Sequence, residues 1–288
     1  MIKKKKKILV FAIFILFILA FFVLNNISCT TIDISNYEIK SSKIPKEFNN
    51  YKIVQLSDLH NKYYGENGEY LVEKVNEIKP DLIVMTGDMV SSFDKDYTNF
   101  LSLSKSLANN YPIYYILGNH EEDLSKENIN KIFSKLEEYN VKILKNEFDS
   151  INIGDCKINI YGLSKHLKTK KGVIQNKYVL DNLLKNINEE EFNILLAHNP
   201  LLFEDYAKYG VDLTFSGHVH GGIIRLPKIG GILSPNVSFL PKYSKGKYEI
   251  GSSNLIVSAG IGIGRWPIRI FNNLDIPVVI LKSIWQLI

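Results

Sequence analysis

The sequence contains few of the residues that define several specialised classes of protein. Its 288 residues include only two cysteines, Cys29 and Cys156, which are too few for a disulfide-stapled scaffold or a zinc site built from thiolates. No Gly-x-y period is present, which excludes a collagen-like chain. A hydrophobic fraction of 45% with 23% charged residues excludes a disordered chain. The length is sufficient for one large buried core.

The chain beyond its first residues also lacks an excess of charge. The formal net charge is +5, but residues 3–7 are five consecutive lysines, which leaves 30 basic against 30 acidic residues elsewhere. A domain without a basic excess is not typical of nucleic-acid-binding proteins. We therefore predict no nucleic-acid partner.

The lysines are followed by an uninterrupted apolar run over residues 8–24, without a polar side chain, glycine or proline. As a helix this run is roughly 25 Å long, and flanking lysines can extend its reach across a ~30 Å hydrocarbon core. We expect a single-pass membrane anchor. Lysines before the span favour an N-terminus inside the cell and a remaining chain outside the cytoplasm, at the cell membrane.

A cleaved signal peptide is the alternative interpretation of this run. Such peptides have a shorter apolar region of about 7–15 residues and end in a small-x-small site. Here the run is followed by Asn25-Asn26-Ile27-Ser28-Cys29. The pair Ser28-Cys29 resembles a lipoprotein cleavage site, although Asn26 stands where an aliphatic residue is expected. Cleavage or lipidation at Cys29 therefore remains open.

The rest of the chain alternates strand-like and helix-like stretches. We divide the sequence into a basic N-terminus (1–7), an anchor (8–24), a polar linker (25–36) and one domain (37–288). Helical spacing of apolar residues predicts helices over 69–78, 100–107, 126–139 and 178–187. Strand-like apolar runs lie at 52–56, 82–85, 113–117, 157–161, 194–197, 213–215, 255–258 and 277–281. This alternation predicts an α/β domain whose sheets are covered by helices. We interpret residues 222–251 as a long loop.

Five short polar motifs directly follow strand-like runs, and they contain five of the six histidines. They are Ser57-Asp58-Leu59-His60, Thr86-Gly87-Asp88, Gly118-Asn119-His120-Glu121, His198-Asn199-Pro200 and Gly217-His218-Val219-His220. Because the carboxyl ends of strands line the ligand crevice of an α/β sheet, we expect the five motifs to converge there. The sixth histidine, His166, is expected in a solvated loop.

These motifs offer imidazole, carboxylate and amide ligands but no thiolate. Such a set suits Mn²⁺, Fe or Zn²⁺ better than Ca²⁺ or Mg²⁺. It also exceeds what one ion takes, whereas two ions about 3.5–4 Å apart that share a carboxylate would use all of it. The candidate ligands are Asp58, His60, Asp88, Asn119, His198, His218 and His220.

The motifs, together with the stretches Gln55–His60, Pro80–Asp88 and Ser216–Gly222, resemble the calcineurin-like metallophosphoesterase superfamily from about residue 37 to the C-terminus. The sequence of these motifs is similar to that of the bacterial membrane-anchored branch, which includes wall-associated phosphoesterases and UDP-2,3-diacylglucosamine pyrophosphatase-like enzymes. Two departures from the family pattern are Ser91 after Gly-Asp-x-Val and Ser164-Lys165-His166 where an acidic residue is frequent.

The resemblance implies a four-layer αββα sandwich and two divalent transition-metal ions, Mn²⁺, Zn²⁺ or Fe. By motif, Asp58, His60 and His220 would hold the first ion. Asp88 would bridge both ions, and Asn119, His198 and His218 would hold the second. His120 would lie against the scissile group as a catalytic residue rather than a ligand.

The expected function is therefore dinuclear metal-dependent hydrolysis of a phosphodiester or phosphomonoester at the membrane surface. Membrane- and wall-associated phosphoesters are candidate substrates. One alternative is pyrophosphatase action on a nucleotide-linked lipid, which a domain outside the cytoplasm would not meet. Another is a binding module without catalysis, although such proteins usually lack ligands and none is missing here.

Arginine is scarce in this chain, which has 32 lysines but only Arg225, Arg265 and Arg269. Where lysine is the usual cation, a retained arginine suggests the bidentate geometry of phosphate recognition. We therefore include all three as candidate substrate contacts, with an ordinary ion-pairing role as the alternative.

Overall fold

The computed structural model describes residues 2–165, 167, 169–170, 173–235, 238–264 and 267–284. His166 and Arg265, for which the sequence carries expectations, lie outside these residues.

The first of two six-stranded sheets has the order β1-β16-β2-β3-β4-β5. Its central strands β2 (Lys52–Leu56), β3 (Leu82–Met85), β4 (Ile113–Tyr115) and β5 (Lys142–Ile143) are parallel. The strand β16 (Leu274–Ser283) runs antiparallel to β2, and β1 (Ile32–Ser41) runs parallel to β16.

The second sheet has the order β14-β15-β11-β10-β7-β6. Its parallel strands are β7 (Cys156–Leu163), β10 (Asn193–Ala197), β11 (Leu213–Ser216) and β15 (Ser253–Val257), and the antiparallel edges are β6 (Glu147–Ile153) and β14 (Gly246–Ile250). Two small hairpins are β8 (Thr169–Lys170) with β9 (Val173–Ile174) and β12 (Arg225–Leu226) with β13 (Gly230–Gly231).

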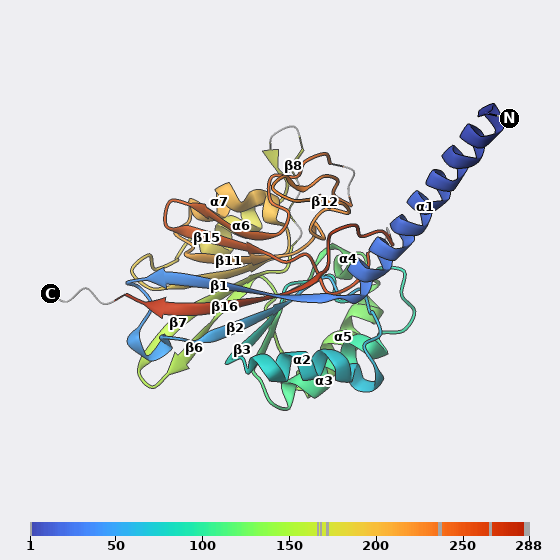
Figure 1. Ribbon diagram of the computed structural model, residues 1–288. Coiled ribbons are helices and arrows are strands. Elements are labelled where there is room, and N and C mark those ends of the chain that lie inside the picture. Colours follow the sequence, from blue (N-terminus) through green and yellow to red (C-terminus); the bar gives the residue numbers. More distant parts are fainter. Residues whose placement is uncertain are drawn as a thin grey trace.

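Helices cover the outer face of each sheet (Figure 1). The first sheet is covered by α2 (Glu69–Ile78), α3 (Thr98–Ala108) and α5 (Lys126–Glu138), and the second by α6 (Lys177–Leu184) and α7 (Phe203–Ala207). The short helix α4 (Asn119–Glu122) follows β4, and 3₁₀ turns lie at Lys46–Phe48, Glu66–Gly68 and Pro200–Leu202. The apolar helix α1 (Ile2–Thr30) extends away from the domain (Figure 1).

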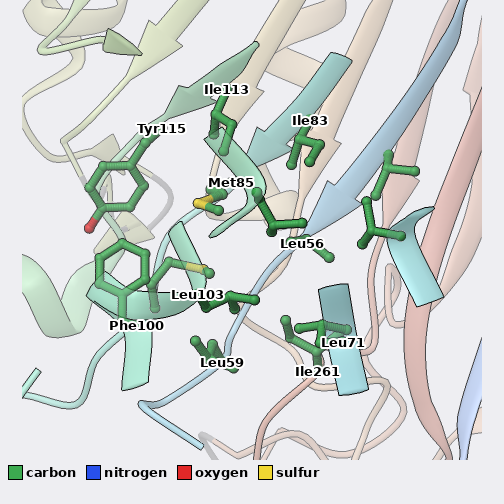
Figure 2. Close-up of a cluster of buried hydrophobic side chains, with 14 of the residues drawn as sticks. Leu56, Leu59, Leu71, Ile83, Met85, Phe100, Leu103, Ile113, Tyr115 and Ile261 are labelled. Atoms are coloured by element: carbon green, nitrogen blue, oxygen red, sulfur yellow. The ribbon is translucent and has the colours of Figure 1, made fainter. Parts of the chain in front are cut away.

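Buried apolar side chains fill the spaces between the four layers. Because neighbouring residues of a strand point to opposite faces, Ile53 of β2 packs against the second sheet while Val54 packs against the helices. Figure 2 shows the helix-side cluster, which contains Leu71 of α2, Phe100 of α3 and Met85 of β3. The predicted four-layer αββα sandwich is confirmed.

The predicted linker over 25–36 is wrong. The helix α1 continues to Thr30, and β1 begins at Ile32. Ser28 and Cys29 are buried against the domain, which holds the end of the helix in place. The strands β1, β6 and β14 were not predicted, because edge strands expose one side and their sequences read as polar. The segment 222–251, which we expected to be a long loop, therefore contains a sheet strand, β14.

Candidate metal centre

The five polar motifs lie at the carboxyl ends of strands from both sheets. Asp58 and His60 follow β2, Asp88 follows β3, and Asn119 and His120 open α4 after β4. In the second sheet, His198 follows β10, and His218 and His220 follow β11. The two sheets therefore contribute from facing sides to one site, as the sequence predicts.

Within this site, side chains form three groups whose ligand-type atoms lie within 4.8 Å of one another. One group is Asp58, His60 and His220, and a second is Asp88, His198 and His218. The third joins His60 and Asp88 to His120. Imidazole and carboxylate groups clustered in this way are suited to a dimetal site.

Hydrogen bonds fix the direction of two of the imidazoles. The Nδ1–H of His198 donates to the carbonyl oxygen of Thr86 at 2.7 Å, and its Nε2 lies 3.1 Å from Oδ2 of Asp88. Nε2 of His220 lies 3.3 Å from Oδ1 of Asp58 and 3.1 Å from Nε2 of His60. In a metal-binding histidine, one ring nitrogen typically faces the other ligand atoms while the opposite nitrogen makes a hydrogen bond.

Burial sets the charges of these groups. It lowers the pKa of His60 to about 4 and that of His220 well below its ordinary value, so both imidazoles are neutral at pH 7, the form that binds a metal. Burial raises the pKa of Asp58 to about 6. Desolvation opposes charge on His198, but the adjacent Asp88 carboxylate raises its pKa to about 10. A cation held among these groups would favour the ionised carboxylates.

Two further observations fit a resident cation. Among the described residues, the buried Oδ1 of Asn119 has no hydrogen-bond partner, and an unpaired buried carbonyl oxygen is costly unless it has a ligand. Five candidate ligands also have positive φ angles, a conformation that costs about 1 kcal/mol or more for a residue with a side chain. The five are Asp58 (53°), His60 (48°), Asp88 (51°), His218 (71°) and His220 (51°).

Two glycines allow the motifs to approach one another. A Cβ atom on Gly118 would lie 2.2 Å from Oδ1 of Asp88, and one on Gly217 would lie 2.2 Å from Oδ2 of Asp58. Because a carboxylate oxygen lies so close, neither position has room for a side chain. Gly87, with φ of 90°, does serve a turn.

Comparison with known proteins agrees with this geometry. The model of the family described as "Calcineurin-like phosphoesterase" matches residues 51–222, a segment that contains all five motifs. The chain belongs to the calcineurin-like phosphoesterase family. It is a metallophosphoesterase, a phosphoester hydrolase.

Two of its relatives are similar in length to this chain. The uncharacterized metallophosphoesterase YkuE of Bacillus subtilis is 32% identical over 88% of this chain and 86% of its own. An uncharacterized metallophosphoesterase of Aquifex aeolicus is 30% identical over 87% of this chain and 92% of its own. Among solved structures, a dimetal phosphatase from Danio rerio is similar with a TM-score of 0.44 at 11% identity, over 74% of this chain and 88% of its own.

In this phosphoesterase His120 is held differently from the candidate ligands. The backbone N–H of Ser92 donates to Nδ1 of His120 at 3.1 Å, so the neutral ring carries its proton on Nε2. The backbone N–H of His120 donates to Oδ1 of Asp88 at 2.8 Å. The rings of His60 and His120 are perpendicular with centroids 4.9 Å apart. His120 can therefore present an N–H donor beside the ligand groups.

Two of the three arginines, Arg225 and Arg269, lie among the described residues, and both donate to backbone carbonyl oxygens. Arg269 is only 3% exposed, and its guanidinium donates to the carbonyl oxygens of Ala259, Gly262 and Asn272. Its Nη2 lies 3.4 Å from Nδ1 of His220. The guanidinium therefore supports that imidazole and does not present its paired N–H groups to solvent. Arg225 donates to the carbonyl of Gly221 at 2.6 Å and lines a cavity beside α1.

Glu121 has a role that the sequence analysis did not assign. Its buried carboxylate accepts hydrogen bonds from the backbone N–H groups of Asp88, Met89, Val90 and Gly118. It therefore joins the loop after β3 to the turn before α4. Its place in the Gly118–Glu121 motif, as an acid directly after a histidine, was the available signal.

Asn272 is a second residue that the sequence analysis missed. Its Nδ2 donates to the carbonyl oxygens of His220 and Gly222 at 2.7 and 2.6 Å. The side chain thereby fixes the backbone on which the last histidine of the motif stands. No motif or spacing in the sequence marks it.

Proposed function

We propose that this phosphoesterase holds two divalent transition-metal ions, Mn²⁺, Zn²⁺ or Fe, and hydrolyses phosphodiesters or phosphomonoesters. Asp58, His60 and His220 would hold one ion. Asn119, His198 and His218 would hold the other, with Asp88 as the bridging carboxylate. The observation that supports this most directly is that two of the three groups of ligand-type side chains have no member in common and each contain one aspartate and two histidines, while the third group connects them through His60 and Asp88.

A pair of such ions supplies an acidified water and neutralises phosphoryl oxygens. The side chains contribute orientation and a proton donor. Thr86 holds His198 with Nε2 toward Asp88, and Arg269 and Asn272 hold His220. His120, with its Nδ1 occupied by Ser92, has Nε2–H available to stabilise or protonate the departing oxygen.

We further propose that α1 remains attached and spans the membrane, with the domain outside the cytoplasm. Within Lys4–Thr30, the most apolar 18-residue stretch has a mean hydropathy of 3.1, and none of that stretch is buried in the protein. Ser28 and Cys29 are buried against the domain, so removal of the helix or lipidation at Cys29 would open a packed contact. This argues against a signal peptide cleaved at Cys29.

The test of the proposed activity is hydrolysis by the full chain in detergent after removal and return of metal. Bis-p-nitrophenyl phosphate and p-nitrophenyl phosphate, assayed side by side, distinguish a diesterase from a monoesterase. We expect release of p-nitrophenol from at least one of them to require Mn²⁺, Zn²⁺ or Fe²⁺. Equal rates with and without metal, or no hydrolysis of either ester with any metal, would contradict the proposal.

A further inference from the structure

The helix α1 and the candidate metal centre lie at the same end of the domain. The strand β1 is parallel to β16, and β16 is antiparallel to β2. The beginning of β1 therefore lies at the edge of the sheet where β2 ends and Asp58 and His60 follow. Since β1 starts at Ile32 and α1 ends at Thr30, the helix leaves the domain at this edge (Figure 1).

A short series of contacts connects the end of the apolar run to the metal centre. The side chain of Asn25, the first residue after the run, accepts a hydrogen bond from the backbone N–H of Arg269 at 2.8 Å. The Arg269 guanidinium in turn lies 3.4 Å from Nδ1 of His220. A single residue, Arg269, thus contacts both Asn25 at the end of the apolar segment and the candidate ligand His220.

The helix is also fixed in direction relative to the domain. Nζ of Lys62 donates to the carbonyl oxygen of Cys29 at 2.7 Å, and the backbone N–H of Leu274 donates to the carbonyl oxygen of Thr31 at 3.0 Å. Ser28 and Cys29 are buried. With one residue between helix and strand, the domain cannot turn freely on its anchor, so the face beside α1 stays toward the bilayer.

That face carries exposed apolar side chains, which we call the apolar rim. Phe271 lines a cavity of about 650 Å³ together with Leu24 and Ile27 of α1. The backbone N–H of Arg225 donates to the carbonyl of Ile270 at 3.0 Å, which places the β12–β13 hairpin next to Phe271. The backbone N–H of Leu240 donates to the carbonyl of Ile232, next to β13, and Tyr63 follows Lys62, which contacts Cys29 of α1. The rim consists of Tyr63, Leu226, Ile229, Phe239, Leu240 and Phe271, each at least 40% exposed.

Two rim residues have an unusual backbone. Phe271 has φ of 52° and Leu240 has φ of 49°, a conformation that is rare for bulky side chains. Both side chains keep about half of their surface exposed, 56% for Phe271 and 48% for Leu240, at a local conformational cost. Strain of this kind is expected where the exposed position itself serves a function.

From these observations, and resting on the function and topology proposed above, we propose that the apolar rim contacts the bilayer spanned by α1 and that the substrate is a phosphodiester in the headgroup of a membrane lipid. In the reaction the oxygen of a water molecule forms a bond to phosphorus. One ester P–O bond breaks, and the departing oxygen takes a proton. The fixed anchor would present this site to headgroups rather than to molecules in free solution.

Two esters with the same leaving group distinguish an effect of the bilayer on the rate from an effect on the chemical step. A diacylglyceryl p-nitrophenyl phosphodiester in phosphatidylcholine vesicles and soluble bis-p-nitrophenyl phosphate release the same leaving group. With the full chain reconstituted in those vesicles, we expect the lipid ester to be hydrolysed faster than the same ester presented in separate vesicles. Ile229→Glu should lower the ratio of lipid to soluble rates about 10-fold by adding a charge to the rim. The control Phe148→Glu, on the opposite edge strand β6, should leave this ratio unchanged.

A second measurement does not depend on activity. In vesicles with brominated acyl chains, the added fluorescence of Tyr63→Trp should be quenched. That of Ser252→Trp, in the turn between β14 and β15 at the far end of the strands, should not be quenched. Fluorescence of the parent protein is subtracted from both.

The outcomes separate this inference from the proposed function. Loss of hydrolysis of both esters in every metal would reject the phosphoesterase activity itself. Hydrolysis of the soluble ester with no preference for the lipid ester in the same bilayer would overturn the lipid substrate. Equal quenching of the two tryptophan variants would overturn the contact of the rim with the bilayer.

Discussion

The sequence Gly118-Asn119-His120-Glu121 places different chemistry at consecutive residues. Gly118 gives room to Asp88, Asn119 has a buried oxygen without a partner among the described residues, and His120 carries a proton on the nitrogen opposite Ser92. The candidate ligands and His120 could be predicted because each motif follows a strand of recognisable apolar sequence. Asn272 could not, since it acts through backbone carbonyls from a distant loop.

Substitution at His120 and Asn119 should separate chemistry from metal binding. We expect His120→Ala to keep near-parental metal content and to lower kcat by about 10²–10⁴-fold, as loss of a proton donor does. The penalty should be smaller for an aryl phosphoester than for an alkyl one, because a good leaving group needs less protonation. Asn119→Ala should lower metal occupancy instead. Metal loss in His120→Ala would make His120 a ligand, and an unchanged kcat for both esters would make it a bystander.

Gly118→Ala tests the close approach to Asp88. The added Cβ would lie 2.2 Å from a carboxylate oxygen, so the carboxylate must move and we expect reduced metal content. The matched control is Gly154→Ala in the β6–β7 turn, where a Cβ meets nothing within 4 Å although φ is 59°. The control should lose about 1 kcal/mol of stability from the backbone alone and keep its metal. Equal metal content in both variants would contradict this account of Gly118.

At the scale of elements, burial decided what the sequence could predict. The strands β2, β3, β10 and β11 are buried on both faces, so they appear as continuous apolar runs and carry the motifs at their ends. The edge strands β1, β6 and β14 consist mostly of exposed and partly buried residues, many of them polar, and were not predicted. The linker prediction failed because the contacts that hold Asn25 and Ser28 come from residues more than 240 positions away.

The position of α4 depends on Glu121. Its carboxylate accepts from four backbone N–H groups, and a glutamine has one acceptor oxygen and an NH₂ that would face donors. We expect Glu121→Gln to lower the free energy of unfolding by roughly 2–3 kcal/mol, measured by urea denaturation. Glu122→Gln, on the same helix, removes the charge of a partly exposed ion pair with Lys165 and should cost less than about 1 kcal/mol. Similar losses in the two variants would contradict the assigned role.

At the scale of the whole molecule, the proposed anchor α1 would determine which compartment the proposed metal centre faces. Because lysines precede the apolar run, we expect the domain outside the cytoplasm. Protease added to intact cells or protoplasts should digest the domain, detected with an antibody against its C-terminus. A cytoplasmic marker protein should survive the same treatment. Protection of the domain until the membrane is lysed would reverse the orientation and favour a nucleotide-linked lipid as substrate.

The central claim is a dinuclear metal centre, built from five motifs on two sheets with one carboxylate shared by both ions. Asp88 is the only side chain assigned to both ions, and its Oδ2 already lies 3.1 Å from Nε2 of His198. The most direct test is elemental analysis of the purified full chain and of Asp88→Asn, paired with phosphoester hydrolysis by the same samples. We expect about two transition-metal ions per parent chain, and a clear loss of both metal and activity in the variant. A parent chain that is fully active with no bound or added metal would contradict the account.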